Sequence, residues 1–272
     1  TVGWAYDAAG LLARLAYPGG ASVAYAYDAA GRMASLTDWL GHTTTYTRDR
    51  SGAIKGIRYG NGTTVAMGYD NAGRLTGLVN SNAAGAVISS HSLTLDGVGN
   101  PTRATLDLPL LPTQLGQTAE MLYDASNRLT SVGGKAITHD TDGRLTGDAS
   151  GTDPIEYAYN AQDQITRVSK AGAVADNYTY DGDGRRVART RSGQTTRYVL
   201  DPTGGDLYRL LTETNASNAP QYHYVYGDSG LVAQIGGTSH RYYHFDQTGN
   251  TLALTNASGT VTDTYAYEPF GN

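Results

Sequence analysis

One short phrase returns along the whole length of this chain and constrains its fold more than any other feature. It is clearest at Tyr25-Ala-Tyr-Asp-Ala-Ala-Gly-Arg-Met33, which reads as tyrosine, aspartate, two small residues, glycine, arginine and an apolar residue. Related phrases stand at Tyr69-Asp-Asn-Ala-Gly-Arg-Leu75, Tyr123-Asp-Ala-Ser-Asn-Arg-Leu129, His139-Asp-Thr-Asp-Gly-Arg-Leu145 and Tyr180-Asp-Gly-Asp-Gly-Arg-Arg186. Self-similarity of this kind indicates a repeat protein in which each unit buries its apolar face against its neighbours.

The acidic position of each phrase marks the period of the repeat. The first four such positions, Asp7, Asp28, Asp49 and Asp70, are separated by three steps of 21 residues. Later positions are less regular: Asp96, Asp124, Asp140, Asn160, Asp181, Asp201, Asp228, Asp246 and Glu268. Two strands for each of these thirteen positions predict about 26 strands.

The residues between these positions alternate with a period of two. Ser22-Val-Ala-Tyr-Ala-Tyr27 places Val23, Tyr25 and Tyr27 on one face, and residues 43–47, 195–200 and 261–267 do likewise. β-branched and aromatic residues in this pattern are typical of strands. No stretch keeps a period of 3.6 over about 12 residues, so we predict no substantial helix and an all-β fold of antiparallel hairpins.

The Asp-x-x-Gly segments between the strands predict tight turns. An Asp side chain accepts hydrogen bonds from the backbone two residues on, and Gly adopts the positive φ that such turns need. Each unit therefore reads as a strand, an Asp/Gly turn, a second strand and a looser Gly-containing turn such as Tyr17-Pro-Gly-Gly20 or Tyr59-Gly-Asn-Gly62.

We assign to this motif a structural role rather than a chemical one. Its residues are Tyr6, Asp7, Gly10, Tyr27, Asp28, Gly31, Arg32, Tyr69, Asp70, Gly73, Arg74, Tyr123, Asp124, Arg128, Asp140, Gly143, Arg144, Tyr180, Asp181, Gly184, Arg185, Asp246, Gly249, Tyr267, Pro269, Phe270 and Gly271.

Residues 101–120 interrupt the rhythm. Leu106-Asp-Leu-Pro-Leu-Leu-Pro112 holds two prolines and no turn phrase. Because proline is excluded from central strands, we predict an irregular insertion or a loop that crosses the sheet. The rest of residues 1–272 reads as a single repeat domain.

The aromatic residues are dominated by tyrosine, with 21 Tyr against 2 Phe and 2 Trp. Rings that need one apolar face and one hydrogen-bonding end are expected on a sheet that is half-buried or wet on one side. The net charge of −5 gives no indication of a nucleic-acid partner. With no cysteine, disulfides and thiolate metal sites are excluded. No run of 18 apolar residues exists, so we predict no membrane-spanning helix.

Tyr-Asp-x-x-Gly-Arg-Leu at a period of about 21 residues resembles the YD repeat of the RHS and teneurin proteins. The segment 241–272, with Tyr243-His-Phe-Asp-Gln-Thr-Gly249 ahead of Tyr267-Glu-Pro-Phe-Gly271, looks like the end of an RHS core. The resemblance covers essentially the whole chain.

This resemblance implies strands that wind in a spiral and form part of a hollow β shell. In bacterial polymorphic toxins and insecticidal toxin complexes such a shell holds a C-terminal toxic domain until delivery. In teneurins the analogous shell carries receptor contacts.

The family pattern continues, after the Pro-Phe-Gly phrase, to a segment ending near Asp-Pro-x-Gly-Leu, where an aspartyl-type self-cleavage frees the toxin. This chain stops at Asn272, and Thr1 also lies close to a repeat phrase. We therefore interpret it as a piece of a longer polypeptide. Asp201-Pro-Thr-Gly-Gly205 resembles the cleavage motif superficially, but it lies within the 20-residue rhythm and has Gly205 where leucine is expected.

Three groups of residues could bind a ligand, and each has a structural alternative. The turns at Asp181 and Asp140 begin like an EF-hand loop, but position 12 is Ser192 or Gly151 where a bidentate Glu is required. On a strand, His240 and His244 lie about 13 Å apart, too far to share a metal ion. The repeated arginines could bind acidic glycans, but an equal supply of aspartates favours ladders in which each Arg pairs with a turn Asp and packs on a Tyr.

Motifs of catalysis are absent from the sequence. There is no Gly-x-Ser-x-Gly elbow, phosphate loop or Cys nucleophile, and no spacing of Ser and His selects a triad. Four glycosylation sequons, at Asn61, Asn177, Asn215 and Asn256, carry little weight in a bacterial protein.

We therefore expect a non-enzymatic shell segment with no cofactor and no metal. The first hypothesis is a secreted bacterial RHS toxin whose shell encloses a C-terminal toxin. The alternative is an extracellular adhesion or filament-forming module that binds glycans or partner cells. The expected partners are the N-terminal repeats and toxin of the same longer chain, further copies through open sheet edges, and a glycan or cell-surface receptor.

Overall fold

The computed structural model describes residues 1–111, 119–203, 208–237 and 239–267. Within these ranges the chain forms 25 strands joined by turns and contains no helix. None of the described residues therefore belongs to a helix that could span a bilayer. The all-β prediction is confirmed, and the expected number of strands is close to the observed one.

The chain divides into two compact units, with unit 1 comprising Thr1–Thr113 and Pro220–Asn272 and unit 2 comprising Gln114–Ala219. The prediction of a single repeat domain over residues 1–272 differs from this division, although both units are built from the same hairpins.

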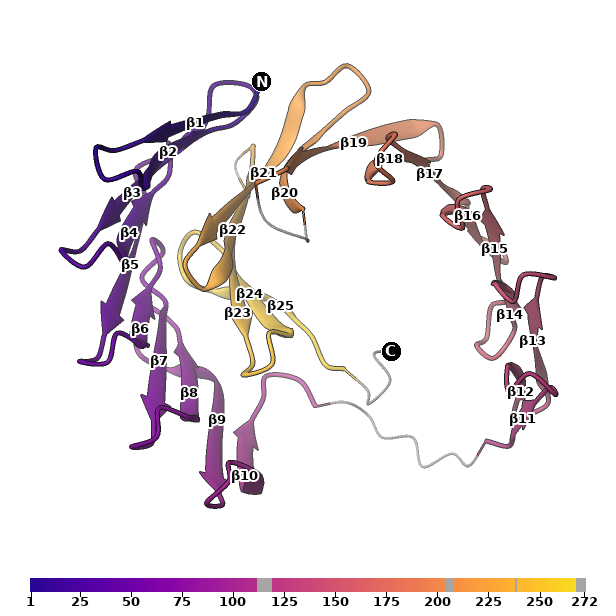
Figure 1. Cartoon of the computed structure of the whole chain (residues 1–272), viewed down its shortest axis with the longest axis horizontal. Coiled ribbons are helices and arrows are strands. Elements are labelled where there is room, and N and C mark those ends of the chain that lie inside the picture. The colour runs from indigo at the N-terminus through magenta and orange to yellow at the C-terminus, as the bar shows by residue number, and fades with distance from the viewer. Residues whose placement is uncertain (112–118, 204–207, 238, 268–272) are drawn as a thin grey trace. The chain divides into compact units, whose positions relative to one another are not determined.

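Unit 1 contains fifteen of the strands in its described part (Figure 1). Its first ten are β1 (Gly3–Tyr6), β2 (Leu12–Ala16), β3 (Ser22–Tyr27), β4 (Met33–Thr37), β5 (Thr43–Arg48), β6 (Ile54–Arg58), β7 (Thr64–Tyr69), β8 (Leu75–Ser81), β9 (Val87–Leu95) and β10 (Pro101–Asp107). The other five are β21 (Pro220–Gly227), β22 (Gly230–Gly236), β23 (Ser239–Phe245), β24 (Thr251–Thr255) and β25 (Val261–Thr264).

Unit 2 contributes the remaining ten strands of the described residues. They are β11 (Met121–Tyr123), β12 (Leu129–Val132), β13 (Lys135–His139), β14 (Leu145–Asp148), β15 (Ile155–Tyr159), β16 (Ile165–Lys170), β17 (Asp176–Tyr180), β18 (Arg186–Arg191), β19 (Gln194–Asp201) and β20 (Arg209–Thr214). Within each unit consecutive strands are neighbours, from β1 to β10 and from β21 to β25 in unit 1 and from β11 to β20 in unit 2, so the sheets are plain antiparallel meanders. This topology follows from the short turns, which allow only neighbouring strands to pair.

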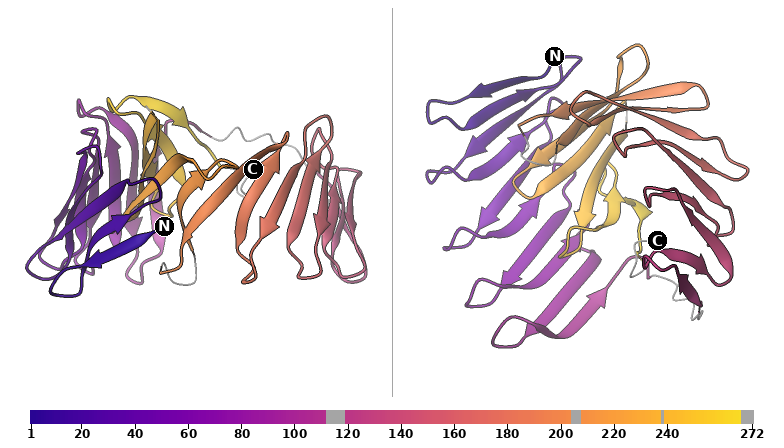
Figure 2. Two further views of the ribbon diagram at one scale, coloured as in Figure 1. Left: turned by 90° about the horizontal axis from the view of Figure 1, so that it is seen from above. Right: turned by 45° about the vertical axis from the view of Figure 1, so that its right-hand side comes forward.

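Two layers of unit 1 pack face to face and bury its core. Figures 1 and 2 show β21–β25 lying against the sheet of β1–β9. The first sheet contributes a row of apolar residues with the repeat spacing of 21, each 2–5% exposed: Leu15, Leu36, Ile57 and Leu78. The second contributes Ala233, Ile235 and Ala253 among others. The sequence period thus sets a core row directly, because residues one repeat apart have the same place on the same face.

The turns at both edges of the first sheet share one backbone pattern. In the Asp28 turn the N–H of Asp28 donates to Arg32 O and that of Gly31 donates to Asp28 O. The same two bonds form at Tyr59, where its N–H donates to Thr63 O and Gly62 donates to Tyr59 O. The prediction of looser turns at Tyr17 and Tyr59 is therefore wrong, since the backbone, not the aspartate, defines the turn.

The fourth position of the turn requires a positive φ. Gly73 has φ +77° with open space where a Cβ would lie, so glycine serves here only for its backbone freedom. In the phrase that begins at Tyr123 the same position is Asn127, with φ +59°. Asparagine is one of the few other residues that tolerate this region, which explains why the turn keeps its conformation with asparagine in place of glycine.

The prediction of an irregular segment at 101–120 is wrong for its first third. Pro101–Asp107 forms β10, which pairs with β9 and has all seven residues exposed. Pro101 is the first residue of the strand, a position that needs no ladder donor, and β10 lies at the edge of its sheet. Residues 112–118 of this prediction lie outside the described part of the chain.

Candidate functional site

In the complete repeat phrases the aspartate of the turn uses both carboxylate oxygens. At Asp28, Oδ1 accepts from the backbone N–H groups of Ala30 at 2.9 Å and Arg32 at 3.0 Å, while Oδ2 accepts from Arg32 Nε at 2.8 Å. The arginine side-chain bond, followed by the backbone bond, lowers the pKa of Asp28. One carboxylate thus reinforces the turn that the backbone closes and fixes the arginine that follows it.

The same pair recurs in the other complete phrases. Nε–Oδ2 distances of 2.6–2.7 Å join Arg74 to Asp70, Arg128 to Asp124, Arg144 to Asp140 and Arg185 to Asp181. The predicted Asp–Arg pairs are therefore present, each within its own turn, and two of the five arginines also lie over tyrosine rings, Arg144 over Tyr159 and Arg185 over Tyr208. Because each guanidinium is neutralised within its own turn, a free basic row for acidic glycans is not favoured.

In the two turns that begin like an EF-hand loop, an arginine again pairs with the turn carboxylates. Arg185 contacts both Asp181 and Asp183, each at 2.6 Å, and Arg144 contacts both Asp140 and Asp142. In each turn the carboxylates that would have to bind calcium are already paired with a guanidinium. This supports the interpretation of these segments as turns.

The tyrosine of the phrase completes the sheet with its hydroxyl group. Tyr69 Oη donates to Ile54 O at 2.9 Å. Ile54 is the first residue of β6 and lies beyond the last pair of the β6–β7 ladder, which joins Gly56 to Ala66. Equivalent bonds join Tyr27 to Leu12, Tyr159 to Leu145, Tyr180 to Ile165 and Tyr267 to Thr251. A phenylalanine would leave this carbonyl unpaired, which explains the excess of Tyr over Phe.

The motif residues do not converge on one place. They are distributed over successive turns in both units, and Tyr6 and Tyr123 are more than half exposed. Pro269, Phe270 and Gly271 lie outside the described residues. This distribution over successive turns is what a structural role predicts.

The polar residues that do converge lie in the seam, our name for the surface where β1–β9 face β21–β25 in unit 1. Tyr17 Oη donates to Tyr224 O, Asn61 Nδ2 donates to Thr255 Oγ1 and Asn256 O, and Asn80 Nδ2 donates to Phe245 O, all at 2.8–3.0 Å. An ion pair between Arg48 and Asp228 adds a charged link. These bonds align the two layers, since each of them joins a side chain of the first sheet to a partner in the second layer.

An apolar cavity of about 460 Å³ also lies in the seam. Its walls include Ile57, Met67 and Leu78 from the first sheet and Leu231 and Phe245 from the second layer. The two layers are therefore packed less closely here than around Leu36.

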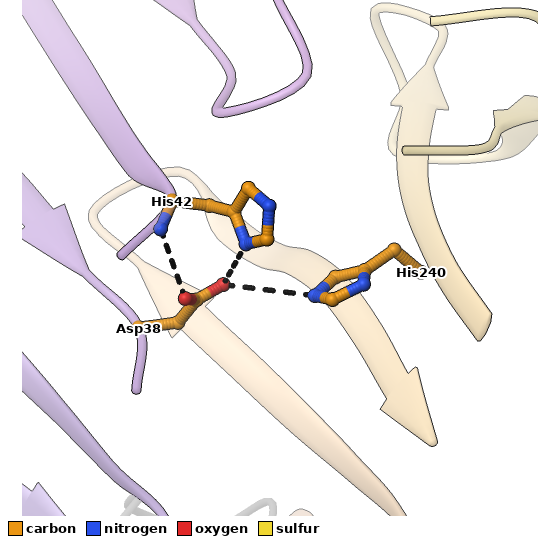
Figure 3. A group of neighbouring side chains, drawn as sticks. All are labelled: Asp38, His42 and His240. Carbon is orange, nitrogen blue, oxygen red and sulfur yellow. Dashed lines mark hydrogen bonds and ion pairs between the residues drawn. The ribbon is translucent and has the colours of Figure 1, made fainter. Parts of the chain in front are cut away.

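One group in the seam combines two histidines and a carboxylate (Figure 3). Asp38 and His42 occupy the turn between β4 and β5, where Asp38 Oδ1 accepts from Leu40 N and His42 N just as in the repeat phrase. Asp38 Oδ2 lies 3.3 Å from His42 Nδ1 and 3.9 Å from Nε2 of His240, which comes from β23. The two imidazole rings meet edge to face, with centroids 4.6 Å apart.

This group was not predicted from the sequence, where His240 was weighed only against His244 as a shared metal ligand and was not paired with His42. A signal was present, because Asp38-Trp-Leu-Gly-His42 repeats Asp-x-x-Gly-Arg with histidine in place of arginine. The contribution of His240 depends on the stacking of the layers, which no local pattern shows.

His244, four residues after His240 on β23, is fully buried. Its Nε2 lies 3.0 Å from Thr255 Oγ1, and its ring meets Tyr59 edge to face. Burial lowers its pKa to about 4, because the charged imidazolium would have to leave water. Burial also lowers the pKa values of His223 and His240.

Comparison with known proteins identifies the family. The chain matches the Teneurin YD-shell family over residues 110–272 and the RHS repeat over residues 6–43. The chain belongs to the Teneurin YD-shell family. The expectation from the repeat phrase is therefore confirmed, and the antiparallel meander is that of an RHS-type β shell.

Curated relatives come from bacteria and from animals. The tRNA nuclease WapA of Bacillus subtilis is 31% identical over 182 residues, covering 66% of this chain and 7% of the relative. Human Teneurin-1 is 30% identical over 152 residues, covering 55% of this chain and 6% of the relative. The chain thus corresponds to a small part of each relative.

Among solved structures, the Photorhabdus luminescens Tc holotoxin pore matches 99% of this chain with a TM-score of 0.62. The match covers 18% of that chain, and the identity of 18% supports similarity of fold alone.

The tyrosine hydroxyl bond predicts a measurable contribution to stability. Tyr69→Phe should lower the free energy of unfolding by about 1 kcal/mol, because Ile54 O loses its partner. The matched control is Tyr6→Phe, which changes the same motif position where no such bond forms among the described residues. Urea unfolding followed by tryptophan fluorescence reports on unit 1, because both tryptophans, Trp4 and Trp39, belong to it. Equal effects of the two substitutions would contradict the assigned role.

The burial of His244 predicts that the free energy of unfolding of unit 1 falls in mild acid. Its pKa is lower in the folded chain than in the unfolded one, so the unfolded state binds more protons and stability falls from about pH 6.5 down to about pH 4. Between pH 7 and pH 5 this histidine should account for about 2 kcal/mol. In His244→Gln that part of the pH dependence should disappear, whereas in His139→Gln, the control in unit 2, it should persist. An unchanged pH profile for His244→Gln would refute the assignment.

Proposed function

We propose that this chain is a segment of the shell of a secreted bacterial RHS toxin, and that the shell encloses a C-terminal toxin domain until delivery. Membership of the YD-shell family and the likeness of its fold to part of a Tc toxin support a structural role. The enzymatic activity in the name of the WapA relative belongs to a protein of which this chain matches 7%.

One comparison within the chain carries the proposal. In unit 1 the residues opposite Tyr25, Tyr46 and Met67 are Leu36, Ile57 and Leu78, which form the core row. In unit 2 the same repeat position holds Tyr157, Tyr178 and Tyr198, opposite Val168, Arg189 and Glu213. The hairpin register is retained, while the aliphatic row is replaced by a mostly charged one.

The side chains on this face of unit 2 are only partly buried. Tyr157, Tyr178 and Tyr198 are half-buried, and Arg186 lies 5.0 Å above the ring of Tyr178 and 5.8 Å above that of Tyr198. Asp176 forms ion pairs with Arg189 and Arg191. An aromatic and charged surface favours a face that borders a lumen over one that forms an aliphatic core, because it offers few large apolar patches to trap an unfolded chain.

The proposal predicts a protected product from the native full-length polypeptide that contains residues 1–272. After purification, mass spectrometry and a denaturing gel should show a discrete C-terminal fragment that co-elutes with the larger fragment under native conditions. Added protease should digest this fragment only after denaturation, because the shell shields it.

A single uncleaved chain with no domain beyond the repeats would favour the alternative of an adhesion or filament-forming module, for which the likeness to Teneurin-1 is the supporting observation. A cleaved fragment that is digested in the native state would contradict enclosure.

A pair of variants tests the role of the unit 2 face. Arg189→Leu with Glu213→Leu restores an aliphatic row, and we expect it to retain the C-terminal fragment at denaturant concentrations that release it from the wild type. Arg197→Leu is the control, because Arg197 pairs with Ala188 on the opposite face and is exposed. Equal release from all three proteins would contradict a lumenal role for this face.

A further inference from the structure

The group at Asp38, His42 and His240 has a donor set that hydrogen bonding alone does not explain. Asp38 Oδ2, His42 Nδ1 and His240 Nε2 all lie within 4.8 Å of one another. A carboxylate oxygen and two imidazole nitrogens that converge in this way are a common ligand set for zinc and for other divalent transition metals.

His240 provides the second and independent observation. Its side chain is 8% exposed, and its Nε2 is buried with no hydrogen-bond partner among the described residues. The 3.9 Å to Asp38 Oδ2 is too long for a hydrogen bond. Native structures rarely leave a buried ring nitrogen unpaired, and this one is directed at a carboxylate oxygen (Figure 3).

The distances fit a metal with small adjustments. Tetrahedral zinc with bonds of about 2.0–2.2 Å places its ligand atoms about 3.3–3.6 Å apart. The Asp38–His42 separation of 3.3 Å already meets this spacing, and the Asp38–His240 separation of 3.9 Å needs only a small rotation of one ring.

The surroundings orient the ligands. Asp38 Oδ1 is held by two backbone N–H groups, which leaves Oδ2 to face the histidines. Asp38 is 5% exposed at its side chain, whereas His42 is 33% exposed and opens the site to solvent on one side.

We propose that Asp38, His42 and His240 bind one divalent transition-metal ion, with zinc the best match, and that this ion joins the β4–β5 turn to β23 across the seam of unit 1. Three protein ligands leave a fourth position for water on the exposed side of His42. Because the ligands come from two layers that are distant in sequence, the ion would act as a cross-link, and its main effect would be on the stability of unit 1.

The test begins with the purified wild-type chain, stripped of metal and titrated with zinc alone. Competition with a chromophoric chelator should give one tight site per chain. Saturating zinc should raise the midpoint of tryptophan-detected unfolding by several degrees. Cobalt(II) in place of zinc should give the visible absorption of a tetrahedral complex, a readout that does not depend on folding stability.

Two substitutions locate the site, and a third is their control. His240→Gln and His42→Gln should each weaken zinc binding at least 100-fold and abolish the cobalt spectrum. His42 lies in a partly exposed turn, so its variant keeps the test valid if His240→Gln does not fold. His139→Gln, in unit 2, should bind zinc as the wild type does. Absence of a tight site in the wild type, or unchanged affinity in a folded His42→Gln, would overturn the proposal.

Discussion

The fold depends on one constraint, a five-residue turn that two backbone hydrogen bonds close, with or without an aspartate at its first position. At Asp28 one carboxylate oxygen reinforces this turn by accepting from two further backbone N–H groups, and the second oxygen holds Arg32. Because the turn is short, each strand pairs with the next, and the sheet grows as a meander. The tyrosine before the aspartate then pairs the carbonyl that the ladder leaves open, as Tyr69 does for Ile54. A phrase of seven residues therefore specifies a turn, the register of its hairpin and the pairing of each strand with the next.

Repetition of this hairpin does not by itself decide what covers the sheet. Unit 1 has a row of Leu36, Ile57 and Leu78 beneath a second layer, and its buried seam carries histidines, a carboxylate and a cavity. Unit 2 keeps the register but has Arg189 and Glu213 in that row. The distinction lies in side chains that the repeat phrase leaves free to vary, and the proposed roles of a lumenal face and a metal cross-link both arise from these variable positions.

Local patterns predicted what is local. The strands, the Asp turns, the Asp–Arg pairs and the need for tyrosine hydroxyls all follow from residues within about 21 positions of one another, so the sequence was sufficient for them. The prediction of a looser turn at Tyr59 was wrong, because its backbone closes in the same way as at Asp28. The prediction of an irregular segment was wrong for residues 101–107, because Pro101 begins an edge strand and needs no ladder donor there. The group around Asp38 was missed because His240 reaches it through layer packing, which depends on contacts distant in sequence.

Hydrogen–deuterium exchange of the purified chain, read by mass spectrometry, tests most directly the claim that one hairpin builds both a covered and an uncovered sheet. The account predicts that peptides from β3–β8 and β22–β24 exchange slowly, because their strands are paired at both edges and packed in two layers. Peptides from β12–β18 should exchange measurably faster despite the same strand pairing. Equal protection in the two sets would contradict the claim and indicate that the unit 2 face is as well covered as the core of unit 1.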